Sequence, residues 1–188
     1  MAETSLTNRK YNFSDADFII FCNTLSSVMT RDLAEMAIYG ITSDTISDFE
    51  DLVNAFQALP SDDLLRADLS YAVEERDNKR NLMMNYMRSI AARSKAIYGE
   101  NSAKYRSLAP GALSKLSDSN LLLAAGQVHS AATTNLTELA AEGVTALYLT
   151  EFQTAINNFE ASINDVSDKK NLRDNGTENK ISKGNELY

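Results

Sequence analysis

The residues of this sequence that could serve as a nucleophile or a general base form no catalytic motif. His129 is the single histidine and Cys22 the single cysteine among 188 residues. An imidazole can act as a general base, and the Cys22 thiol or the hydroxyls of Ser130 and Thr133 could act as nucleophiles. His129 lies at the edge of an apolar helical stripe, with Ser26 at the matching place in the first half of the chain. We therefore interpret His129 as a helix-surface residue, and we predict no catalytic residue and no enzymatic activity.

The ligand spacings of common metal and nucleotide sites are also missing. Transition-metal sites in helical bundles use Glu-x-x-His pairs or closely spaced His and Cys ligands, and no glutamate lies three positions before His129. The sequence contains neither the Asp-x-Asp-x-Asp-Gly pattern of calcium loops nor the glycine-rich pattern of phosphate-binding loops. Cys22 lies in the apolar run FIIFC, which is typical of a buried side chain. We predict no cofactor and no metal site, with oxygen-only binding of Ca²⁺ or Mg²⁺ left open.

Charge is distributed unevenly along the chain. The formal net charge of -8 argues against a nucleic-acid surface, which needs a surplus of Lys and Arg, and against an anionic membrane surface. From Asp44 to Glu75 nine residues are acidic and only Arg66 is basic, whereas eight basic and two acidic residues lie from Arg76 to Arg106. The excess of one sign in each segment is larger than helix dipoles alone would favour.

These two segments define a candidate interaction surface. One hypothesis is that an acidic surface of one molecule meets a basic surface of another and steers head-to-tail association. The other is that both are solvated faces, or that they neutralise each other within one molecule. The run NLMMNYM, residues 81–87, is either an adaptable binding surface or, as its apolar spacing favours, part of the core. The candidate surface residues are Asp44, Asp48, Asp51, Arg80, Met84, Arg88, Arg93 and Lys95.

Apolar stripes and capping residues predict the helices that carry these side chains. Seven glycines and two prolines leave little room for turns in the chain. Ser14 precedes two acidic residues and apolar residues at steps of three and four, which predicts a capped helix over residues 14–39. A second helix, capped by Thr42 or Ser43, ends before Pro60, because proline disfavours the helical conformation in the residue before it. A third helix is expected over residues 61–98.

The pattern of the first half of the chain recurs in the second half. LAEMAIYGIT, Leu33 to Thr42, returns 103 positions later as LTELAAEGVT, Leu136 to Thr145. At the same offset and without a gap, Ser117-Asp118 matches Ser14-Asp15. A match of this length predicts an internal duplication.

The sequence therefore predicts an all-α protein, an antiparallel helical bundle of about six helices. We expect it to be built from two tandem copies of a helical-hairpin unit with pseudo-twofold symmetry. Gly176 and Gly184 each cost about 1 kcal/mol relative to Ala in a helix, so the last helix is the weakest element. The expected organisation is a polar N-terminal arm, residues 1–13, and a single helical domain 14–188 made of repeat one, 14–98, a linker, 99–113, and repeat two, 114–188.

The two copies differ in ways that bear on function. Phe21, Val28 and Met29 of the first copy correspond to alanines in the second. Either the equivalent helices face each other, so that large side chains fill the space left by small ones, or the copies have changed independently. Residues 86–98 have no counterpart in the second copy. We expect function to depend on these differences.

We predict a non-enzymatic structural or interaction protein that self-associates through helix faces and ordered termini, such as a repeating subunit of an assembly. The alternative is a monomeric adaptor or regulator that binds a partner protein. It would use a groove near the Met-rich third helix, or the incomplete groove where the second copy lacks its terminal helix. Residues 1–13 contain no apolar run of the signal-peptide kind, so we expect a cytoplasmic protein by default, its location being otherwise unknown. The expected partner is a second copy or another protein, with neither nucleic acid nor membrane.

Overall fold

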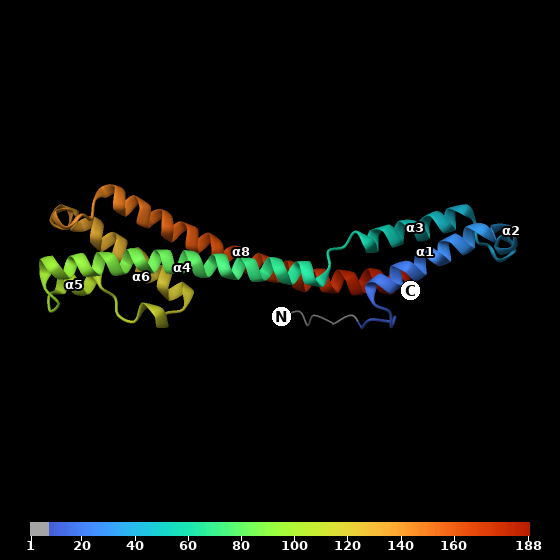
Figure 1. Cartoon of the computed structure of the whole chain (residues 1–188), viewed down its shortest axis with the longest axis horizontal. Helices are drawn as coiled ribbons and strands as arrows, with labels where there is room; N and C mark the ends of the chain where they lie inside the picture. The colour runs from blue at the N-terminus through green and yellow to red at the C-terminus, as the bar shows by residue number, and fades with distance from the viewer. Residues whose placement is uncertain (1–7) are drawn as a thin grey trace. The chain divides into compact units, whose positions relative to one another are not determined.

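The protein is described by a computed structural model of residues 8–188, whose secondary structure is helical throughout (Figure 1). This confirms the all-α prediction. The chain forms two compact units: unit 1 combines residues up to Ala67 with Asn171–Tyr188, and unit 2 comprises Asp68–Lys170. None of the helices in the described range is both long enough and apolar enough to cross a membrane. Whether the two copies form a single domain with pseudo-twofold symmetry stays a prediction.

Unit 1 contains the helices α1 (Asp15–Arg31) and α3 (Ser43–Gln57), joined by the short α2 (Leu33–Met36) and η1 (Ala37–Tyr39). The start of α4 (Asp62–Tyr98) and the end of α8 (Ala146–Leu187) complete it. The caps form as predicted: the Ser14 hydroxyl accepts from the Asp17 amide at 3.1 Å, and Thr42 forms a capping box with Thr45.

The first helix is shorter than the predicted range 14–39. It ends at Arg31 because Asp32 leaves the helical conformation, with φ -102° and ψ 25°. Asn135 has nearly the same angles, φ -103° and ψ 16°, after α6. Short polar side chains compete with the helix for backbone hydrogen bonds, and the Asn135 side chain donates to the Ala131 carbonyl at 2.8 Å. Asp32, the polar residue at this place, explains why α1 ends here, although the apolar stripe predicted that the helix continues.

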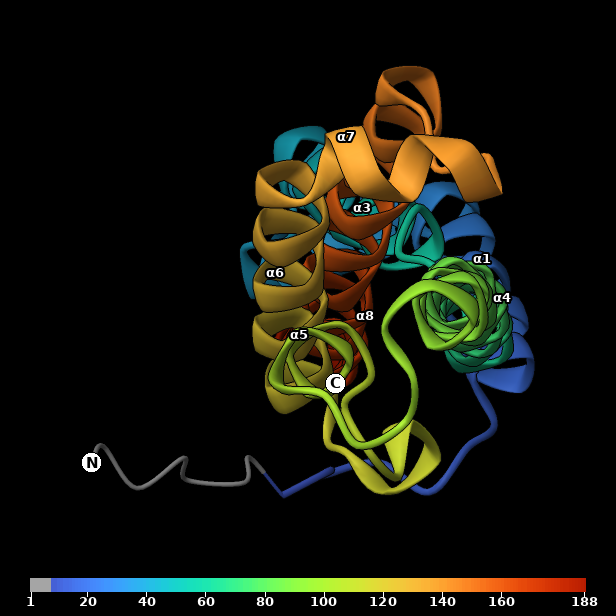
Figure 2. The same ribbon diagram turned by 90° about the vertical axis from the view of Figure 1, so that its left-hand side faces the viewer.

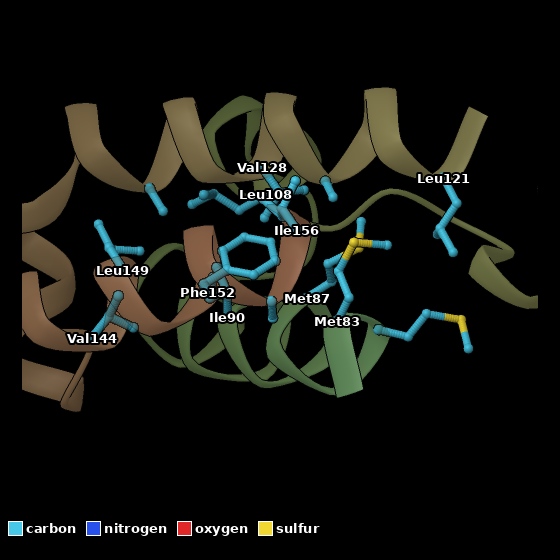
Figure 3. Close-up of a cluster of buried hydrophobic side chains, with 14 of the residues drawn as sticks. Met83, Met87, Ile90, Leu108, Leu121, Val128, Val144, Leu149, Phe152 and Ile156 are labelled. Carbon is cyan, nitrogen blue, oxygen red and sulfur yellow. The ribbon is translucent and has the colours of Figure 1, made fainter. Parts of the chain in front are cut away.

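Unit 2 contains most of α4, α5 (Ala103–Leu108), η2 (Leu113–Lys115), α6 (Asp118–Thr134), α7 (Leu136–Leu139), η3 (Ala140–Glu142) and the start of α8. Its core joins α4, α6 and α8, with Phe152 between side chains of the other two helices (Figure 3). Helix α5 packs on α6 (Figure 2), and its Leu108 is fully buried. The segment 99–113 therefore contains a docked helix capped by Ser102.

Element bounds in the two halves of the chain coincide at the offset of 103 positions seen in the sequence. Helices α1 and α6 have 17 residues each, and α2 and η1 correspond to α7 and η3. Gly40 and Gly143 end these turns with positive φ angles of 84° and 79°. A left-handed conformation carries little strain in glycine, which explains why both copies have it here.

The count of about six helices implied a break before the last helix, and the structure contradicts that break. Pro60 separates α3 from α4 in the first copy because it lacks an amide hydrogen and restricts the residue before it. Ile163 occupies the matching place in the second copy, and α8 runs without interruption from Ala146 to Leu187. It passes through Gly176 and Gly184.

The described part of the N-terminal arm packs on α8 within unit 1. Tyr11 is buried and stacks on Phe18 with ring centroids 4.3 Å apart. The Asn185 side chain accepts from the Lys10 amide at 2.7 Å and donates to the Asn8 carbonyl at 2.9 Å. The stack of Tyr11 on Phe18 and the hydrogen bonds between the Asn185 side chain and the arm's backbone thus hold the arm in place. Residues 1–7 of the predicted arm lie outside the described range.

Gly184 allows this close approach of Tyr11, so Gly184→Ala should destabilise the protein. An added Cβ would meet three Tyr11 atoms at 2.2 to 2.5 Å, and the ring is fixed by its stack on Phe18. We expect a loss of about 1 to 3 kcal/mol, which exceeds the gain of about 1 kcal/mol in helix propensity. Chemical denaturation measures it.

The matched control is Gly176→Ala. Its Cβ would lie 2.5 Å from the Cδ1 atom of Leu65, a flexible end that can rotate away, and 3.9 Å from the Leu65 Cγ atom, which is an ordinary contact. We expect this variant to be neutral or slightly stabilised because it gains the helix propensity of Ala. Equal effects of the two substitutions would show that the Tyr11 contact is unimportant.

Candidate functional site

The basic candidate residues of the charge hypothesis are largely engaged within unit 2. Arg80 donates to the Leu116 carbonyl at 2.6 Å and lies 3.2 Å from a carboxylate oxygen of Asp118. Arg93 donates to the Gly143 carbonyl at 2.7 Å. These contacts fix α4 against the two ends of the segment that contains α6 and η3.

The other three candidates of the basic segment also have contacts close by. Lys95 pairs with Glu100 at 2.8 Å, and Arg88 donates to the side chain of Asn85 at 3.1 Å. Met84 is only 3% exposed and belongs to the unit 2 core together with Met83 and Met87. The three methionines of this run therefore pack in the core and offer no open surface.

The acidic candidates Asp44, Asp48 and Asp51 are exposed on α3 in unit 1. Their spacing of four and three residues places them on one side of the helix. No ion pair found among residues 8–188 involves them. Arg80 and Arg93 thus have contacts with other segments of unit 2, whereas Arg88 and Lys95 are exposed and have only local contacts.

A small groove between α6 and α8 contains the single histidine. It has a volume of about 380 Å³ and is lined by His129, Thr133, Leu149 and Thr150 among others. The ring nitrogen Nε2 of His129 lies 3.2 Å from the Leu149 carbonyl oxygen. Thr133 and Thr150 donate to carbonyls of their own helices at 2.9 and 3.0 Å. The hydroxyls thus make structural hydrogen bonds, and the groove contains no nucleophile paired with the imidazole.

The same groove recurs in unit 1 with different chemistry. A pocket of about 260 Å³ is lined by Thr30, Leu33, Ser43, Ile46, Ser47 and Glu50, each of which matches a residue of the His129 groove at the offset of 103. Where unit 2 has His129 and Gln153, unit 1 has Ser26 and Glu50, which form a hydrogen bond. Grooves at the same positions with unrelated polar groups are typical of hairpin packing and not of a shared active site.

The larger difference between the units is a face of the α1–α3 hairpin that we call the open face. In unit 2 the equivalent residues belong to the core or pack against it, together with Met87 and Ile90 of α4. In unit 1, α8 contributes Leu187 to the core, and its end lies beside the start of α1 (Figure 1). Phe21 is 48% exposed, and the rest of the face is half-buried. The open face consists of Phe21, Leu25, Val28, Met29, Phe49 and Leu52.

The open face escaped the sequence-based candidate list, although a signal was present. Phe21, Val28 and Met29 correspond to Ala124, Ala131 and Ala132, which all contact the unit 2 core. These small side chains leave space that α4 and α5 fill. Packing within unit 2 therefore explains the alanines without contact from the first copy. A change from small to large between copies therefore indicates that the first copy has a different neighbour on this face.

Other groups that could perform chemistry are dispersed. Cys22 is buried, and burial raises the pKa of its thiol, which disfavours the reactive thiolate. Within residues 8–188 no three side chains of His, Cys, Asp or Glu gather as metal ligands.

Tyr98, at the C-terminal end of α4 beside Glu138, should make the free energy of unfolding depend on pH in the alkaline range. Burial raises the pKa of Tyr98 from an ordinary value of 10.0 to about 12, and the Glu138 carboxylate adds to the rise. The neutral phenol is favoured in the folded state, so its contribution is complete below pH 10 and is lost as pH rises toward 12. We expect the free energy of unfolding to fall over this interval less steeply in Tyr98→Phe than in the wild type. Titration of phenolate absorbance provides the check: the tyrosine missing from the variant should be one that titrates late.

Comparison with known proteins identifies no relative, since no family model, curated protein or solved structure matches the chain.

Proposed function

We propose that the protein is a non-enzymatic interaction protein that binds a helix on the open face of unit 1. The observation that carries this proposal is the contrast between matched positions. Phe152 of unit 2 is fully buried beneath α4, whereas Phe49 is half-buried and Phe21 is nearly half exposed. Apolar residues that are buried in one unit and open in the other are typical of a protein interaction surface.

The arrangement of polar groups supports a binding role over a catalytic one. The hydroxyls beside His129 donate to helix carbonyls, and the Cys22 thiol is buried. The net charge of -8 favours a protein partner over nucleic acid or an anionic membrane.

Self-association into an assembly is the second candidate. Ile38 and Tyr39 at the tip of the hairpin are 77% and 82% exposed, and Ala141 and Glu142 replace them in unit 2. Large apolar side chains at a tip can anchor contacts between subunits. The head-to-tail charge version has less support, because Arg80 and Arg93 already have partners in unit 2.

We also propose that the chain arose by tandem duplication of one helical-hairpin unit. The supporting observation is that the bounds of the first helix, its capping serine and the left-handed glycine after it recur at an offset of 103 positions. In this view unit 2 contains the third helix of the first copy, α4, and unit 1 contains the last part of the second copy, the end of α8.

Affinity capture with matched variants tests the proposed function. Val28→Glu places a charge on the open face, whereas Ile20→Glu changes a side chain that is 64% exposed and whose counterpart, Leu123, is also exposed. A true partner should be retained by the wild type and by Ile20→Glu and lost by Val28→Glu. Sedimentation of the same three proteins detects self-association. If no associated protein and no self-association depended on Val28, the open face would not be a binding surface.

A further inference from the structure

We infer that the occupant of the open face is a basic amphipathic helix of a partner protein, with the chemistry of residues 83–98 of this chain. The inference rests on the proposed function, because it names the partner of the same surface. It is carried by unit 2, where α4 covers the equivalent face and so shows which side chains fit there.

The apolar side of the expected helix follows from α4. Met83, Met87, Ile90 and Ser94 are fully buried at steps of four, three and four residues. Tyr86 packs on Phe152, with ring centroids 5.8 Å apart, and Phe49 is the matching residue of unit 1. A helix with large apolar residues at this spacing and a small residue near its end can therefore fill the open face.

The direction of the helix follows from two polar contacts of α4. Arg76 and Arg80 pair with Asp118 at the start of α6, and Arg93 donates to the Gly143 carbonyl beyond its end. Helix α4 thus runs parallel to α6. Gly40 has almost the same backbone angles as Gly143, φ 84° and ψ 9° against φ 79° and ψ 16°. An arginine of a partner helix that runs parallel to α1 would accordingly meet the Gly40 carbonyl.

Charge indicates that the helix is basic. Helix α3 contains Asp44, Asp48, Glu50 and Asp51 and no basic residue. Asp48 corresponds to Glu151, whose carboxylate lies 3.5 Å from the Tyr86 hydroxyl of α4, so Asp48 should border the docked helix. Residues 83–98 contain Arg88, Arg93 and Lys95 and no acidic residue. Opposite charges at the rim of such a site raise the association rate and select the partner.

A second copy of this chain is a poorer source of the helix. Its own residues 83–98 are held in its unit 2, where Met87 and Ile90 are fully buried. Withdrawing them would expose as much apolar surface as docking would cover, so the exchange yields no net burial. A helix from another protein carries no such cost.

The test is binding of a labelled synthetic peptide of residues 83–98 to the full-length protein, followed by fluorescence anisotropy. We expect saturable binding that weakens with salt and at least about tenfold weaker binding to Val28→Glu and to Asp48→Lys. The matched controls Ile20→Glu and Asp51→Lys should bind like the wild type. The counterpart of Ile20, Leu123, is exposed in unit 2, and the counterpart of Asp51, Thr154, lines the His129 groove, whereas Glu151 meets Tyr86 of α4. A peptide of the same composition in scrambled order should not bind.

Absence of peptide binding, or binding that both Val28→Glu and Asp48→Lys leave unchanged, would overturn the inference. Sedimentation separates this failure from failure of the proposed function. A dimer of the full-length protein that Val28→Glu dissociates, without peptide binding, would keep the open face as a binding surface and assign it to a second copy. Loss of both signals would overturn both proposals. Because Asp48 is exposed on α3, Asp48→Lys should leave the fold intact. Its peptide affinity therefore tests the inference even if Val28→Glu affects folding.

Discussion

Phe152→Ala is expected to destabilise unit 2 by about 3 to 5 kcal/mol, the range for removing a fully buried aromatic side chain. Phe152 lies at the centre of the unit 2 core, within 5.8 Å of the ring centroids of both Tyr86 and His129. No other helix could close the cavity without moving α4, which is held by Arg80 and Arg93 at separate places. The cavity should therefore remain open, and the full loss of stability should appear as a lower midpoint of urea unfolding.

The control for this experiment lies within the same chain. Phe49 is the residue equivalent to Phe152, but it is half-buried in unit 1 and only packs against the edge of the core there. Phe49→Ala should cost about 1 to 2 kcal/mol, because less apolar surface leaves water at this site on folding. If the two units unfold in separate transitions, each variant should shift only the transition of its own unit. Equal losses at the two positions would contradict the difference in coverage on which the open face rests.

Leu108→Ala is expected to cost about 2 to 5 kcal/mol, although the residue lies in a segment that sequence patterns predict to be a linker. Leu108 ends α5 and is fully buried in the unit 2 core. A flexible connection would tolerate this substitution with almost no change in stability. Thermal or urea unfolding of the variant thus distinguishes a docked helix from a linker.

Ser107→Ala serves as the reference for Leu108→Ala. The Ser107 side chain is exposed and donates to the Lys104 carbonyl of its own helix at 2.8 Å. Its removal should change the unfolding free energy by less than about 0.5 kcal/mol. A Leu108 variant as stable as the Ser107 variant would mean that α5 does not contribute to the core.

Helix caps and glycine turns were predictable because they depend on short stretches of chain. Ser14, Thr42 and Ser117 each cap the helix that follows, and the Gly40 turn recurs at Gly143. At the offset of 103 positions the bounds of α1, α2 and η1 coincide with those of α6, α7 and η3, and the duplication stays a prediction. Pro60 was also interpreted correctly as the end of a helix.

Features that depend on distant contacts were not predictable in the same way. The continuity of α8 depends on Ile163 occupying the place of Pro60, which an apolar stripe alone does not reveal. The docking of Leu108 and the engagement of Arg80 and Arg93 arise between segments far apart in sequence. The charge pattern showed where acidic and basic residues concentrate but not which of them already had partners.

The exchange of large for small residues was visible in the sequence and was open to two interpretations. Ala132 is fully buried in the unit 2 core, whereas Met29 on the open face is half-buried. Residue size alone cannot distinguish packing between the copies from packing on a third helix. In unit 2 the third helix, α4, covers the hairpin, so the small residues are explained by packing on α4. The occupant of the open face is the subject of the peptide-binding experiment.

The most direct test of the open face is the thiol reactivity of Leu25→Cys compared with Val128→Cys, each introduced with Cys22→Ala. Leu25 and Val128 are equivalent positions, half-buried in unit 1 and 1% exposed in unit 2. We expect the cysteine at position 25 to react readily with a water-soluble thiol reagent and the cysteine at position 128 to be strongly protected in the folded protein. Equal protection of the two thiols would show that the α1–α3 face is covered and would contradict the account.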